Sequence, residues 1–62
     1  MGEVGARVRV VAGPGRGGIG KIAEVSQSPC ALESGVIAWG AEVTLTTGDR
    51  VFVPWENLEL FG

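Results

Sequence analysis

Apolar and polar residues alternate in short runs along this chain, and glycine and proline separate the runs. Arg7-Val8-Arg9-Val10 has a period of two, which places Val8 and Val10 on one face and both arginines on the other. The segment from Gly13 to Gly18 cannot continue this strand, because Pro14 lacks an N–H donor and glycines favour positive φ. The pattern therefore predicts a strand followed by a turn.

Lys21 to Val25 is predicted as the returning strand, although its apolar residues do not keep a strict period of two. Ile22 and Val25 are three positions apart. Either Ala23 and Val25 share the core face, or a β-bulge lets Ile22 and Val25 both face inward.

The middle of the chain is predicted to be a long loop followed by a long strand. Ser26 to Gly35 has no period and is rich in turn residues, so we expect a loop of roughly ten residues. Val36 to Leu45 resumes strand character, and Gly40 marks a bend or a close backbone approach. The inward positions of this strand are Ala41, Val43 and Leu45.

The last third predicts a hairpin, a single 3₁₀ turn and a final strand. Thr46 to Asp49 is a tight turn, and Arg50 to Val53 is the returning strand that Pro54 ends. Trp55 to Asn57 has the length of one 3₁₀ turn, and Leu58 to Leu60 alternates once more. The prediction is an all-β fold, a small five-stranded barrel with one 3₁₀ turn before the last strand.

Length and composition indicate one small domain over residues 1–62. A chain of this length buries only about 60% of its unfolded surface, so its core is small. Such domains are usually reinforced by disulfides, a metal or self-association. The sequence has one cysteine and no histidine, which leaves a homo-oligomer as the available reinforcement.

No segment looks like a membrane anchor or a signal peptide. No apolar run approaches the roughly 18 residues of a membrane span, and the N-terminal residues lack a charged region followed by an apolar one. We therefore expect no membrane partner and a cytoplasmic location.

Charge is unevenly distributed along the chain. The formal net charge is −2, which argues against nucleic-acid binding by bulk charge. Residues 1–21 nevertheless hold four of the five basic residues and one acid, whereas residues 22–62 hold one basic residue and six acids. The positive charge lies around the first predicted hairpin.

Residues 7 to 25, with Gly17, Gly20 and Ile22 at the motif's spacing, resemble a KOW motif. This motif occurs in SH3-like barrels of ribosomal proteins and of NusG-type transcription factors. The resemblance implies an SH3-like barrel that binds RNA or another protein through its strand-joining loops and rim.

The turn departs from both kinds of KOW relative. Arg16 and Lys21 match the basic residues of the nucleic-acid-binding relatives, whereas Pro14 and Gly18 do not. Gly15 and Gly18 occupy sites where NusG-type turns carry aromatic contacts.

Seven residues are candidates for partner contact. They are Arg7, Arg9, Arg16, Lys21, Trp39, Phe52 and Trp55. The basic residues, together with Arg50, could form a phosphate-binding patch, or they form a solvated face paired with Glu24 or Glu42.

The three aromatic candidates also have two interpretations. Trp39 and Trp55 lie beside strand ends, where they either anchor a partner or close the barrel core. Phe52 is out of phase with Val51 and Val53, so it faces outward if those valines are core, which suggests a protein interface or a subunit contact.

The sequence offers no catalytic residue, metal site or cofactor site. Cys30 lacks a histidine or a second cysteine, and the serines lack a histidine to activate them. The glycine turn lacks the Walker spacing for a phosphate loop. We predict a noncatalytic binding module for protein or RNA, with a self-associating structural protein as the alternative.

One enzyme alternative comes from the type II dihydrofolate reductases, which are similar small barrels that tetramerise around a pore. Their pore strand carries Val-Gln-Ile-Tyr, whereas the corresponding strand here reads Val51-Phe52-Val53-Pro54. Because the glutamine and the tyrosine are missing, no residue of this strand supplies the polar contacts that bind folate in those enzymes.

Overall fold

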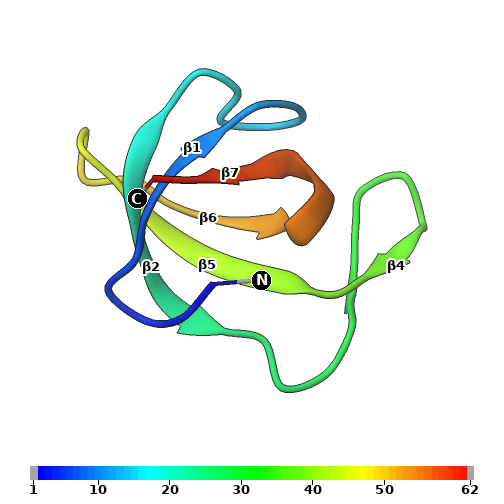
Figure 1. The fold of residues 1–62 in the computed structure, drawn as a ribbon. Coiled ribbons are helices and arrows are strands. Elements are labelled where there is room, and N and C mark those ends of the chain that lie inside the picture. Colours follow the sequence, from blue (N-terminus) through cyan, green and yellow to red (C-terminus); the bar gives the residue numbers. More distant parts are fainter. Residues whose placement is uncertain (1, 62) are drawn as a thin grey trace.

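A computed structural model describes residues 2–61 as an all-β fold built on one antiparallel sheet (Figure 1). The sheet contains five strands in the order β6-β5-β2-β1-β7, and a separate two-stranded hairpin pairs β3 with β4. The elements are β1 (Arg7–Val10), β2 (Ile19–Val25), β3 (Cys30–Ala31), β4 (Ile37–Ala38), β5 (Gly40–Leu45), β6 (Arg50–Pro54), the 3₁₀ turn η1 (Trp55–Asn57) and β7 (Leu58–Leu60). The all-β prediction and the position of the 3₁₀ turn are confirmed.

One face of the sheet forms the core. The side chains on it come from alternate positions of β1, β2, β5 and β6, as a period of two requires. They are Val8, Val10, Ile22, Ala41, Val43, Leu45 and Val53. The predicted inward positions of the first strand and of residues 41–45 are therefore confirmed.

A β-bulge in β2 settles the ambiguity of the returning strand. The pairing of β2 with β5 shifts between Ile22 and Glu24, so one extra residue, Ala23, is inserted there. Ile22 is 1% exposed, and Val25 packs against the same core. The bulge thus brings two residues three apart onto one face, and Ala23 and Val25 do not form the core pair.

The segment predicted as an irregular loop contains a second hairpin. β3 lies within Ser26 to Gly35 and pairs with β4, which follows this segment, and the Leu32 N–H donates to the Val36 carbonyl at 2.8 Å. The single strand predicted from Val36 to Leu45 is also wrong, because it is divided at Trp39. In Figure 1 this hairpin projects away from the five-stranded sheet.

Just after this division, β5 begins at a crowded glycine. A Cβ on Gly40 would collide with the carbonyl oxygen of Val53 on β6. The same holds for Gly20 on β2, where a Cβ would collide with the carbonyl oxygen of Thr44. The predicted close backbone approach at Gly40 is confirmed.

The sheet is open between its two edge strands. Among the described residues, no strand pairing joins β6 to β7. The 3₁₀ turn connects these two strands, and the Val11 N–H donates to the Asn57 carbonyl at 2.8 Å. Residues 2–61 contain no helix with the length and apolarity needed to cross a bilayer.

We predict that Gly40→Ala destabilises the protein by about 2 kcal/mol or more. The new methyl group would press on a backbone carbonyl of the paired strand, and a backbone cannot swing aside as a side chain can. Urea unfolding followed by tryptophan fluorescence measures the change. Thr44→Ala, at an exposed position of the same strand, is the control and should cost less than about 1 kcal/mol. Equal stability of the two variants would contradict the crowding at Gly40.

Candidate binding surface

Phe52 lies on the sheet face opposite the core, at the meeting point of two hollows. It pairs directly with Glu42 on β5, whereas its neighbour Val53 is 1% exposed on the core face. The prediction that Phe52 faces away from the core is confirmed. The side chain is nevertheless only half-exposed, because parts of Ser26 to Ser34 lie beside it and line both hollows with it.

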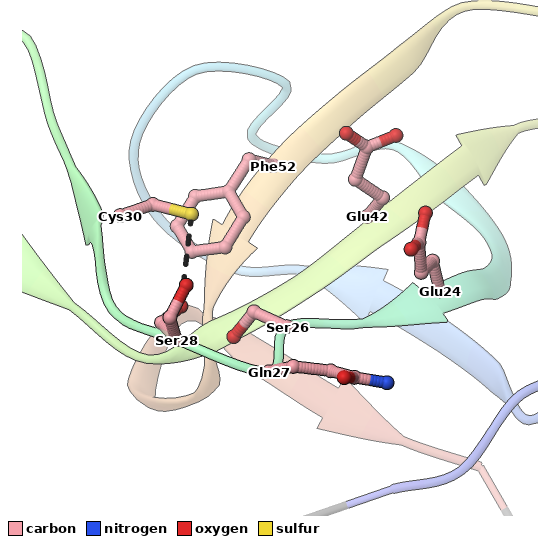
Figure 2. A pocket seen from close by; sticks show the side chains of 7 residues that line it. All are labelled: Glu24, Ser26, Gln27, Ser28, Cys30, Glu42 and Phe52. Carbon is pink, nitrogen blue, oxygen red and sulfur yellow. Dashed lines mark hydrogen bonds between the residues drawn. The ribbon is translucent and has the colours of Figure 1, made fainter.

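The first hollow is small and polar (Figure 2). It has a volume of about 170 Å³. Its lining residues are Glu24, Ser26, Gln27, Ser28, Cys30, Glu42 and Phe52. Most of its polar groups already have partners in the protein: the Cys30 thiol donates to the Ser28 carbonyl at 3.9 Å, and the Ser26 hydroxyl accepts from the Gly40 N–H at 3.1 Å.

The second hollow is a larger, mainly apolar groove of about 550 Å³. It lies between the first turn, the tip of the β3–β4 hairpin, the end of β6 and η1. Its lining residues are Gly13, Pro14, Ala31, Leu32, Glu33, Ser34, Phe52, Pro54 and Asn57. This volume falls in the range typical of ligand-binding clefts. We call this hollow the β6 groove.

Two of the five basic side chains are neutralised by carboxylates. Arg50 contacts Glu42 at 2.6 Å and Glu24 at 3.6 Å, and Arg9 contacts Glu59 at 2.5 Å. The prediction that Arg7 and Arg9 pair with Glu24 or Glu42 is therefore wrong. The register places Arg50 beside these two acids and places Arg9 opposite Glu59.

The remaining basic residues do not form one compact patch. Arg7 and Lys21 are direct cross-strand neighbours on the outer face, and the Arg7 guanidinium lies 5.7 Å from the centre of the Phe61 ring. Arg16 is on the first turn, where it lines a hollow of about 220 Å³ together with Arg9. The structure thus groups the four predicted residues in two pairs, Arg7 with Lys21 and Arg9 with Arg16.

The two tryptophans have different environments. Trp55 is half-buried and packs against the core, whereas Trp39 is 53% exposed. The core interpretation therefore holds for Trp55 and is wrong for Trp39. Val36 and Ile37, beside Trp39, are 58% and 66% exposed. The strand character of residues 36–45 predicted one long strand over this apolar stretch, and the exposure of Val36 and Ile37 was not predicted.

The N–H groups of the glycine-rich turn bond within the turn and the adjoining strand. Arg16 N–H donates to the Gly13 carbonyl, Gly17 N–H to Val10 and Gly18 N–H to Gly15, at 2.7 to 3.0 Å. These donors are therefore not turned toward an anion. Within residues 2–61, no three His, Cys, Asp or Glu side chains gather as metal ligands would.

Comparison of the chain with protein-family models, with curated proteins and with solved structures finds no match. The surface must therefore be interpreted from its own chemistry.

We predict that Arg50→Gln lowers the free energy of unfolding by about 0.5 to 1 kcal/mol, because it removes the cation that separates two carboxylates. Glu24 and Glu42 face each other across β2 and β5, and like charges in such a pair repel. The loss should shrink in about 1 M salt, where screening is strong. Arg16→Gln, at an exposed residue of the first turn, is the matched control and should leave stability unchanged. A loss in Arg50→Gln that salt does not reduce would contradict this electrostatic role.

Proposed function

We propose that this chain is a noncatalytic binding module of the SH3-like, KOW-type class, and that it takes an apolar segment of a partner protein in the β6 groove. The observation that carries the proposal is the groove itself. Leu32, Phe52 and Pro54 are among its apolar residues, and it is the largest of the three hollows described above. Burial of apolar side chains in such a cleft is the usual source of affinity for a small module.

The fold assignment rests on topology and on the first hairpin. The order β6-β5-β2-β1-β7, with η1 between the two edge strands, supports an SH3-like arrangement. Two glycines of residues 7 to 25 have conformations or contacts that only glycine accommodates easily, which supports the resemblance of this segment to a KOW motif. Gly17 has φ +87°, and Gly20 lies where a Cβ would collide with β5.

Charge favours protein over RNA as the partner. Arg9 and Arg50 are already paired with acids, and Glu33 is the one charged residue lining the β6 groove. Arg7, Lys21 and Arg16 are the other basic residues, and the net charge of −2 opposes a polyanion. Val51-Phe52-Val53-Pro54 supplies no side-chain amide or phenol to a folate, so the reductase alternative finds no support in this strand.

We predict that Phe52→Ala weakens peptide binding by at least about tenfold, since truncating a central aromatic anchor removes much of a small interface's affinity. The measurement is the affinity for peptides of about 12 residues selected against the wild-type domain from a random display library. Phe61→Ala is the matched control, because Phe61 is the other phenylalanine and does not line the groove. Its affinity should stay within about twofold of wild type.

Unfolding curves of both variants show whether each is folded under the binding conditions. Recovery of no peptide by the wild-type domain, or equal effects of the two substitutions, would contradict a groove-based function.

We predict that a single-stranded RNA of about 20 nucleotides binds with a Kd weaker than about 10⁻⁴ M at about 150 mM salt, because few free cations face it. Fluorescence anisotropy across a salt series measures both the affinity and its salt slope. A micromolar Kd with a slope near that of three phosphate contacts, lost in Arg7→Gln/Lys21→Gln, would make RNA the partner instead.

A further inference from the structure

One edge of the sheet has backbone groups directed away from the protein, next to the β6 groove. The Trp55 N–H donates to the Trp39 carbonyl at 3.2 Å, and the Leu45 N–H donates to the Asp49 carbonyl at 2.8 Å. Both bonds belong to the register in which β5 pairs with β6. Hydrogen-bonded and non-bonded pairs alternate in antiparallel strands.

This alternation shows which residue pairs between the Trp39–Trp55 bond and the Leu45–Asp49 bond are hydrogen-bonded. Ala41–Val53 and Val43–Val51 are hydrogen-bonded pairs, whereas Gly40–Pro54, Glu42–Phe52 and Thr44–Arg50 are not. Pro54, which has no N–H, therefore occupies a position where β5 requires no donor from it. The N–H and C=O of Phe52 point away from β5.

The backbone groups of Phe52 find no partner on the other side of β6. Among the described residues, none of the backbone hydrogen bonds outside the sheet involves the N–H or C=O of Phe52. Phe52 also lines the β6 groove, together with Gly13 and Pro14 of the first turn. Phe52 thus lines the groove and also carries, on the edge of β6, an N–H and a C=O with no partner among the described residues.

The groove carries one charge. Glu33, at the tip of the β3–β4 hairpin, lines the groove, and no Lys or Arg lines it. Among the described residues, the ion pairs of this protein involve Glu24, Glu42 and Glu59 but not Glu33. An occupant with a Lys or Arg beside its apolar anchor would complement this carboxylate.

We infer that the occupant of the β6 groove is an extended segment of a partner protein that adds as a short strand to β6, with a basic residue next to its apolar anchor. The inference rests on the proposed function. One residue of the segment exchanges backbone hydrogen bonds with Phe52, and its own apolar side chain, which is on the same face as the side chains of Phe52 and Pro54, is the anchor. Main-chain bonds supply affinity in this mode, and the pocket and Glu33 supply specificity.

The test is a backbone N-methyl scan of the tightest peptide that the display library yields. Strand addition predicts that the effect of N-methylation on affinity alternates from one peptide residue to the next. Methylation of every second residue, over a short stretch, should weaken binding by about tenfold, because those N–H groups face β6, while methylation of the residues between them should have little effect. A peptide bound without main-chain pairing would show no such period.

A charge swap tests the second half of the inference. Wild-type protein should bind the peptide with its Lys or Arg at least about fivefold more tightly than the same peptide with Glu there, and Glu33→Lys should reverse that order. Glu3→Lys, at an exposed acid outside the groove, is the matched control and should keep the wild-type order.

Each of the remaining outcomes would contradict a particular part of the two proposals. Phe52-dependent binding without the N-methyl period, for instance by a proline-rich peptide, overturns strand addition and leaves the proposed function standing. If Glu33→Lys still prefers the peptide with Lys or Arg, the proposed pairing of a basic peptide residue with Glu33 is wrong. Failure to recover any Phe52-dependent peptide overturns both proposals. Sedimentation that finds the domain dimeric, with peptides binding only after dissociation, makes a second copy the occupant and overturns the inference.

Discussion

The close packing of β5 against both of its neighbouring strands depends on two places where backbone occupies the space of a missing β-carbon. Gly20 allows the Thr44 carbonyl to pass close to β2, and Gly40 allows the Val53 carbonyl to pass close to β5. Both contacts join β5 to a neighbouring strand. β5 and the two strands that it joins, β2 and β6, supply five of the seven side chains of the core.

The β3–β4 hairpin lies directly before the crowded start of β5. Trp39 separates β4 from β5, and its carbonyl still accepts from the Trp55 N–H. The hairpin tip then forms one wall of the β6 groove, opposite the first turn. Val36, Ile37 and Trp39 stay exposed in this part of the chain and add nothing to the core.

Alternation along the chain was sufficient to predict the inner faces of β1, β5 and β6, the 3₁₀ turn and the outward placement of Phe52, because each depends on neighbours in the sequence. For Trp39, local pattern left both interpretations open, an exposed anchor or a core residue. Trp39 is exposed, and it lies where residues 36–45 divide into β4 and β5. The partners of Arg50 depend on the register of three strands, and the bulge in β2 changes that register. Local pattern therefore identified the sheet, whereas the groove arises from contacts between distant segments.

Pro54 sets a limit on what the free edge of β6 can do. A sheet edge with an unbroken row of donors can recruit identical strands one after another, and this is how cross-β fibrils grow. Here the row of N–H donors ends at Pro54, which is the last residue of β6. The edge can pair with a short added strand, but it offers no continuous template on which identical chains could polymerise.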